Sequence, residues 1–195
     1  MIIYLHGFNS SPGSHKASWF GRWLAERGLA NEYACPALPT RPQDAIATVE
    51  ALMAARLGAK PGTRFTFLGS SLGGFYATWL AERHDANAVL VNPAVDPHIG
   101  LCAYLGLQQN LYTAEKWTLT EEHLAEWKSL YVPLITPSRY LLLVETGDEV
   151  LDYRRAVERY AGAQQVVVQG GDHSLMSFPD QVGRILEFAG LSPSR

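Results

Sequence analysis

Six short apolar runs alternate along this chain with longer stretches in which apolar residues recur every three or four positions. The runs are rich in β-branched and aromatic residues and are bounded by glycine, proline or asparagine, a pattern typical of β-strands. We therefore expect strands at residues 2–5, 32–38, 64–69, 88–92, 140–146 and 165–170.

The stretches between these runs predict amphipathic helices. In the first of them Trp19, Phe20, Trp23 and Leu24 share one helical face, and Gly28 stands where a C-cap belongs. The predicted helices cover residues 15–28, 42–58, 75–85 and 152–162. Alternating strands and helices favour right-handed crossovers and a parallel sheet that is covered on both faces. We expect one three-layer α/β domain over residues 1–195.

Residues 93–137 break this alternation. No strand is expected there, only helical pieces at 100–112 and 116–130. The segment is long for a plain crossover, and it follows the carboxyl end of a strand, where open α/β sheets bind ligands, so it is interpreted as a helical lid. An extended crossover of two helices is the alternative. The aromatic residues of this segment either line an acyl pocket or pack the helices: Tyr104, Tyr112, Trp117, Trp127 and Tyr131.

Composition narrows the classes of protein to consider. Hydrophobic residues make up 47% of the 195 residues and the net charge is −3, which fits a globular core and gives no basic footprint for nucleic acid. Cys35 and Cys102 have no paired spacing, so neither a disulfide framework nor a zinc site is expected. The sequence shows no signal peptide and no apolar window long enough to span a membrane, and a cytoplasmic protein is expected.

The sequence Gly-Ser-Ser-Leu-Gly-Gly at residues 69–74 joins a predicted strand to a predicted helix. Gly69, Ser71 and Gly73 match the Gly-x-Ser-x-Gly nucleophile elbow, in which a sharp turn exposes the serine hydroxyl above the sheet. The flanking glycines would pack against each other too closely for a Cβ atom, and Gly74 would let the helix lie close to the neighbouring strand. A P-loop is excluded because Phe75 follows where lysine is required.

A serine hydroxyl needs a base to take its proton, and the base needs an acid to orient it. His173 follows the last predicted strand, and Asp148 follows the strand before it, in the chain order serine, acid, histidine. Asp96, after the preceding strand, is the rival acid, whereas Asp172 adjoins the base in sequence and would orient it poorly. Ser71, Asp148 and His173 are therefore the predicted catalytic residues.

An oxyanion formed at this serine would need two backbone N–H donors. The residue after the nucleophile, Leu72, supplies one. The first predicted strand is followed directly by His6 and Gly7, which let the chain turn beneath the serine, and the N–H of Phe8 is the expected second donor.

Taken together, these motifs resemble the α/β-hydrolases, and more closely the YqiA-like family of small bacterial esterases. The similarity covers nearly the whole chain and is carried by MIIYLHGFNSSPGSHKA, GSSLGGFYATWLAE, TGDEVLDYR and GGDHSLMSF. It implies an α/β-hydrolase fold with about six mostly parallel strands and a small helical lid, without the first two strands of the full fold. It also implies Ser71, Asp148 and His173 as the triad, hydrolysis of short acyl esters and of acyl thioesters, and no metal or cofactor.

Two other classes of function remain open at this point. The same triad supports other serine hydrolase chemistry, such as peptide or carbon–carbon bond cleavage. The fold also occurs in proteins that bind a ligand without catalysis, because fold alone does not fix function. The three catalytic groups argue against the second class, since a binding protein has no need to keep nucleophile, base and acid together.

Overall fold

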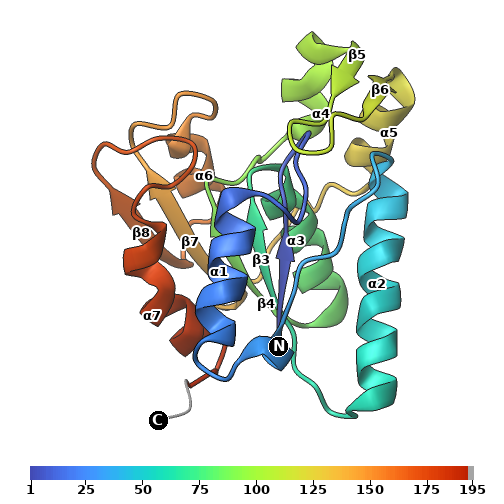
Figure 1. Cartoon of the computed structure of the whole chain (residues 1–195). Coiled ribbons are helices and arrows are strands. Elements are labelled where there is room, and N and C mark those ends of the chain that lie inside the picture. Colours follow the sequence, from blue (N-terminus) through green and yellow to red (C-terminus); the bar gives the residue numbers. More distant parts are fainter. Residues whose placement is uncertain (193–195) are drawn as a thin grey trace.

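A six-stranded parallel sheet forms the centre of the computed structural model, which describes residues 1–192 (Figure 1). Its strand order is β2-β1-β3-β4-β7-β8, and every pairing is parallel. The fold class predicted from the sequence is confirmed. The strands are β1 (Ile2–Leu5), β2 (Tyr33–Ala34), β3 (Thr66–Ser70), β4 (Asn87–Val91), β7 (Tyr140–Glu145) and β8 (Gln164–Val168).

Helices cover both faces of this sheet, because alternate side chains of each strand point to opposite sides. In β1, Ile2 and Tyr4 pack with α1 (His15–Ala25) and α7 (Phe178–Phe188). Ile3 and Leu5 pack on the other side, with three further helices. These are α2 (Pro42–Ala59), α3 (Leu72–His84) and α6 (Tyr153–Arg159). The result is a three-layer arrangement with one hydrophobic core on each side of the sheet.

The prediction of an all-helical segment at residues 93–137 is wrong. A two-stranded antiparallel hairpin, β5 (Gly106–Gln109) and β6 (Lys116–Leu119), occupies its centre. Gly106, the first residue of β5, has φ +111°, which favours glycine, and Thr120 ends β6 because its N–H donates to His123 Nδ1 at the start of the next helix. The other elements are α4 (Pro97–Gly100), η2 (Leu101–Tyr104), α5 (Glu121–Ser129) and η3 (Pro137–Arg139).

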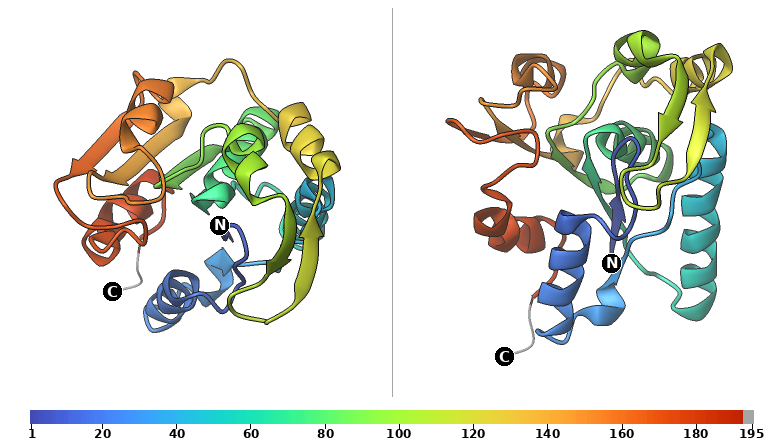
Figure 2. Two further views of the ribbon diagram at one scale, coloured as in Figure 1. Left: turned by 90° about the horizontal axis from the view of Figure 1, so that it is seen from above. Right: turned by 45° about the horizontal axis from the view of Figure 1, so that its top comes forward.

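The hairpin lies beside the loop that follows β1 (Figure 2), and hydrogen bonds hold it there. The Leu111 N–H donates to the Asn9 carbonyl at 2.8 Å, and the Asn110 side chain donates to the Ser10 carbonyl at 2.7 Å. The segment between β4 and β7 therefore lies over the carboxyl ends of the strands.

Several other elements differ from the prediction, and α1 and α6 each end three residues before their predicted ends. The predicted strand at 32–38 shrinks to Tyr33–Ala34, preceded by η1 (Ala30–Glu32), because Pro36 and Pro39 have no N–H to give to a neighbouring strand. Helix α3 begins three residues before the predicted start, directly after Ser71. Helix α7 was not predicted. Among residues 1–192, no helix is both long and apolar enough to cross a membrane.

Candidate active site

Ser71 lies at the turn between β3 and α3 with φ 54° and ψ −120°, a backbone conformation that residues other than glycine rarely adopt. Its backbone is held from three directions. The Ser71 N–H donates to the Val91 carbonyl at 3.0 Å, and the Ser71 carbonyl accepts from the N–H groups of Gly74 and Ala94 at 2.9 and 3.0 Å. The strained turn is thus fixed by both β4 and α3.

The glycines around Ser71 are required by close backbone approaches. A Cβ atom on Gly69 would lie 2.2 Å from the Gly73 carbonyl oxygen, and one on Gly73 would lie 2.0 Å from the Leu5 carbonyl oxygen. A Cβ atom on Gly74 would lie 2.5 Å from the side chain of Pro93, the second residue after β4. The close packing predicted from the Gly-x-Ser-x-Gly spacing is therefore present in the structure.

Asp148 contacts the ring of His173. The two Asp148 carboxylate oxygens lie 2.9 and 2.8 Å from His173 Nδ1, and the Asp148 side chain is only 1% exposed. The same carboxylate accepts the N–H groups of Val150 and Leu151 at 2.9 and 2.8 Å. Burial alone would raise the pKa of Asp148, but the hydrogen bonds from His173 and these amides outweigh it and hold the pKa below its usual range.

The two other candidate acids have different partners. Asp96 pairs with Arg155 at 2.5 Å, and Asp172 accepts the N–H of Ser174 at 2.8 Å. The structure therefore brings Asp148 to His173 and leaves the Asp96 and Asp172 carboxylates on other groups.

Ser71 and His173 line one cavity of about 620 Å³, within the range usual for small-molecule sites. Because Nδ1 of His173 faces Asp148, the opposite ring nitrogen, Nε2, is the one left to exchange a proton with a substrate or with Ser71. Ser70 borders the same cavity. Across residues 1–192, no three His, Cys, Asp or Glu side chains form a group that could hold a metal ion.

Glu145, which is not one of the predicted catalytic residues, organises the loop that carries His173. It is 1% exposed at the end of β7, and its carboxylate accepts the N–H groups of Asp172, Met176 and Ser177 at 2.8, 3.0 and 2.7 Å. Burial alone would raise the pKa of Glu145, but the hydrogen bonds from this loop hold it below its usual range.

Asn92, directly after β4, holds the same loop from the other side. Its side-chain N–H₂ donates to the carbonyls of Asp172 and His173 at 3.0 and 3.1 Å, and its Oδ1 accepts the N–H of Glu145 at 3.1 Å. A polar residue after an apolar strand was a signal available in the sequence. The loop that it would reach, 80 residues away, was not.

Leu72 and Phe8, the two predicted oxyanion donors, both lie near Ser71: Leu72 follows it in the chain, and Phe8 lines the same cavity. Leu72 is the first residue of α3, whose N–H has no partner within the helix. Phe8 follows Gly7, and a Cβ atom on Gly7 would lie 3.2 Å from Ser71 Cβ. Within residues 1–192, neither the Phe8 nor the Leu72 N–H donates a hydrogen bond to another protein group. Both amides are therefore available beside the serine.

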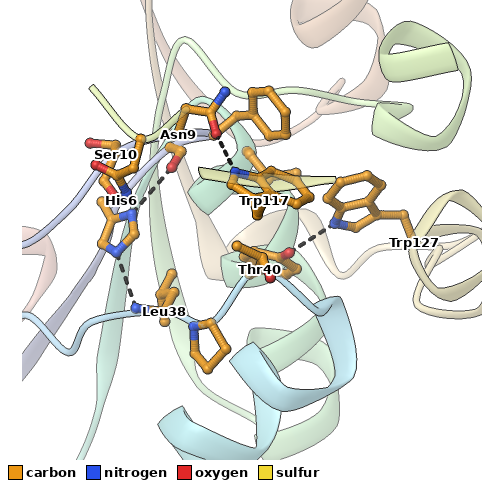
Figure 3. Close-up of a pocket in the computed structure, with 13 residues that line it drawn as sticks. His6, Asn9, Ser10, Leu38, Thr40, Trp117 and Trp127 are labelled. Atoms are coloured by element: carbon orange, nitrogen blue, oxygen red, sulfur yellow. Dashed lines mark hydrogen bonds between the residues drawn. The ribbon is translucent and has the colours of Figure 1, made fainter. Parts of the chain in front are cut away.

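His6 fixes the loop that presents Phe8. Its Nδ1 donates to the Gly7 carbonyl and its Nε2 accepts the Leu38 N–H, both at 3.1 Å, an arrangement that requires a neutral ring (Figure 3). Burial lowers the pKa of His6 in agreement with this. His6 is thus a structural tie between the loops that follow β1 and β2.

Two tryptophans of the segment between β4 and β7, Trp117 and Trp127, make edge contacts with the ring of Phe8. Trp117 Nε1 donates to Asn9 Oδ1 and Trp127 Nε1 donates to the Tyr76 hydroxyl, each at 2.8 Å, around a cavity of only about 40 Å³ (Figure 3). Of the five aromatic residues proposed from sequence to line an acyl pocket, Tyr112 borders the large cavity. Trp117 and Trp127 serve the packing alternative.

Known families and solved structures include several that are similar to this chain. The model of the family described as "Uncharacterised protein family (UPF0227)" matches residues 1–190. Similar solved structures include one from Agrobacterium vitis S4, with a TM-score of 0.70 and 19% identity over 97% of this chain and 86% of that one.

Two further structures give nearly the same values. Alpha/beta hydrolase domain-containing protein 10 from mouse and Est1E from Butyrivibrio proteoclasticus each have a TM-score of 0.69 and 16% identity. Each alignment covers 97% of this chain and 88% of the other. These similarities show that the fold is the α/β-hydrolase fold, as the sequence resemblance implied.

Proposed function

The chain belongs to the UPF0227, or YqiA-like, family, and we propose that it is a serine hydrolase that cleaves small acyl esters or acyl thioesters. One observation carries the proposal. Ser71, in a strained elbow, lines the same cavity as His173, and Nδ1 of His173 is held by the buried carboxylate of Asp148. A nucleophile, a base and an orienting acid on three different loops are what acyl transfer needs.

The first half-reaction forms an acyl-enzyme. Ser71 Oγ attacks the ester carbonyl carbon while His173 Nε2 takes the hydroxyl proton. The negative charge that develops on the carbonyl oxygen is stabilised by the N–H groups of Phe8 and Leu72. When the tetrahedral intermediate collapses, the bond to the leaving group breaks and His173 gives its proton to the departing alcohol or thiol. Asp148 stabilises the imidazolium in between.

The second half-reaction releases the acid. Water attacks the acyl-enzyme carbonyl while His173 Nε2 accepts its proton, and the same two N–H groups stabilise the second oxyanion. Collapse breaks the bond to Ser71 Oγ, which recovers its proton from His173. The residues of the site thus return to their starting state, and water is the only reactant besides the ester or thioester.

Hydrolysis of p-nitrophenyl butyrate and of a short acyl thioester tests this proposal. We expect kcat/KM to fall by about 10³-fold or more in Ser71→Ala, because removing the nucleophile leaves only binding and oxyanion stabilisation. Ser70→Ala is the matched control, since Ser70 borders the same cavity, and it should keep most of the activity. A folded wild type that cleaves neither substrate would contradict the proposal and favour a ligand-binding protein.

A further inference from the structure

The large cavity beside Ser71 has one lysine in its wall, Lys16, and no arginine from the described part of the chain. Lys16 lines it together with histidines, hydroxyl groups and apolar side chains. Within residues 1–192, no aspartate or glutamate belongs to the lining. A site for neutral esters has no need of an ammonium group without a carboxylate beside it in the cavity wall, because desolvating a charge is costly unless it is paired.

Lys16 is the second residue of α1, and its ammonium group reaches across the cavity wall to the loop that carries His173. Nζ donates to the carbonyl oxygen of Ser174 and lies 5.7 Å from the centre of the Phe178 ring. The Lys16 ammonium group therefore contacts the residue that follows His173 in the chain.

The carboxylates nearest to Lys16 are already engaged. Asp148 pairs with His173, Glu145 accepts three backbone N–H groups, and Asp172 accepts the N–H of Ser174. Their charges act to raise the pKa of Lys16, but burial outweighs them and lowers it to about 8. The ammonium group is thus only partly compensated by the protein.

We propose that this cavity selects esters that carry an anionic group, and that Lys16 is the residue that pairs with that group. The inference rests on the proposed ester hydrolysis at Ser71 and names the substrate class for it. A carboxylate, sulfonate or phosphate in the cavity would supply the missing charge and form a charge-assisted hydrogen bond with Lys16.

The remaining walls indicate that the substrate also has an apolar part. Trp19, Leu175 and Phe178 line the interior, while Leu111 and Met176 line the cavity and are 80% and 71% exposed. Exposed apolar side chains at a cavity are suited to an apolar ligand group that covers them. The site thus fits an ester with an apolar body and one anionic group.

Two matched pairs of esters test the proposal, with the charge on either side of the scissile bond. The first pair is p-nitrophenyl monoglutarate and p-nitrophenyl pentanoate, which differ in the acyl end. The second pair is 4-sulfophenyl butyrate and p-nitrophenyl butyrate, which differ in the leaving group. For each pair, the ratio of kcat/KM, charged over neutral, is measured in the wild type, Lys16→Arg and Lys16→Gln.

In at least one pair, we expect the ratio to fall by about ten- to a hundredfold in Lys16→Gln, the usual range for a lost hydrogen bond to a charged group. Lys16→Arg should keep most of the ratio, because the positive charge remains. Comparison within a pair cancels the intrinsic reactivity of each ester. It also cancels any displacement of the His173 loop, which would slow both esters alike.

The pH dependence gives a second readout. In the wild type, the ratio should fall as pH rises through about 8, where Lys16 loses its proton, whereas in Lys16→Arg it should stay constant over that range. Asp148, Glu145 and Asp172 are the acidic groups that face Lys16.

The outcomes separate this inference from the function on which it rests. Neutral esters cleaved through Ser71, with ratios unchanged in Lys16→Gln for both pairs, would overturn the anionic substrate class and leave the hydrolase intact. A folded wild type that cleaves none of the four esters would overturn both. A ratio that falls in Lys16→Gln and is kept in Lys16→Arg supports the proposal.

Discussion

The carboxylate of Glu145 fills the space that a side chain on Gly171 would need: Glu145 Oε2 lies 1.9 Å from the position of a Cβ atom built on Gly171. Gly171 also has a φ of +72°, so the backbone itself favours glycine there. The loop bearing His173 is therefore wrapped around a buried carboxylate, and its shape depends on this contact.

Gly171→Ala should displace the His173 loop, whereas Gly170→Ala should not. Both glycines have a positive φ, and a Cβ atom on Gly170 meets nothing within 4 Å. Gly170→Ala should cost only the backbone term, about 1–2 kcal/mol of stability. Gly171→Ala should in addition lower kcat/KM for a p-nitrophenyl ester about a hundredfold, the usual cost of misplacing a catalytic group. Equal activity in the two variants would show that the contact with Glu145 does not position His173.

Glu145→Gln should weaken the hydrogen bonds that hold the same loop, because it changes the acceptor instead of the glycine. An amide in this position turns an N–H₂ donor toward backbone donors, and at least one N–H among residues 172–177 loses its acceptor. We expect kcat/KM to fall by at least about tenfold. A displacement of a catalytic group by about 1 Å can cost about a hundredfold, so a smaller displacement of His173 is enough for this loss. Glu149→Gln, at an exposed residue that accepts only the His173 N–H in the same loop, is the control and should lose less.

The lowered pKa of Glu145 also predicts an acid-dependent part of stability. Because the folded pKa lies below the ordinary value of 4.5, Glu145 contributes stability above pH 4.5 that is lost as pH falls through the lowered value. The difference in unfolding free energy between the wild type and Glu145→Gln should be largest above pH 5 and should shrink below pH 4.5. Urea unfolding from pH 3 to pH 7 measures it. A difference that is constant with pH would contradict the assignment.

Asp148→Asn and Asp96→Asn decide between the two acids that the sequence left open. An asparagine at 148 cannot hold His173 in the correct tautomer, and the comparable change in serine proteases costs about 10⁴-fold in kcat. Asp96→Asn removes only the partner of Arg155 and should leave kcat within about threefold, as expected for a surface ion pair. A large loss in Asp96→Asn with an active Asp148→Asn would reverse the assignment.

Gly73→Ala and Gly58→Ala should change stability in opposite directions. A Cβ atom on Gly73 would lie 2.0 Å from the Leu5 carbonyl oxygen, so α3 must move from β1, at a cost of about 1–3 kcal/mol or more. A Cβ atom on Gly58, within α2, meets nothing within 4 Å, and alanine should stabilise that helix by about 0.5–1 kcal/mol. Thermal unfolding of the two variants provides the comparison.

The parts of the fold that follow from local pattern were predictable. The β1, β3, β4, β7 and β8 strands lie within two residues of their predicted ends, because each is a buried apolar run between turn-forming residues. The elbow was predictable for a similar reason: the Gly-x-Ser-x-Gly spacing encodes one particular turn.

The β5–β6 hairpin was not predictable in the same way. Its strands are short and half-exposed, and their main ties are to Asn9, a hundred residues away. The boundary at Thr120 was a readable signal, because threonine followed by two glutamates is typical of a helix start. Helix α7 was readable as well, since Phe178, Val182, Ile185 and Leu186 share one face.

The supports of the site depend on contacts that no local pattern contains. Asn92 follows β4 and Glu145 ends the neighbouring strand β7, yet both contact residues 172–177, in a loop that lies far from them in the sequence. The cation of Lys16 in the cavity is likewise a product of the way α1 packs beside α7.

Intact-mass labelling with a fluorophosphonate probe, on the wild type and on Ser71→Ala, tests the central claim most directly. The probe forms a covalent bond only with an activated serine, and it needs no knowledge of the natural substrate. We predict a single adduct on the wild type that is absent from folded Ser71→Ala. A folded wild type without an adduct, or an adduct that persists in Ser71→Ala, would contradict the assignment of Ser71 as the nucleophile.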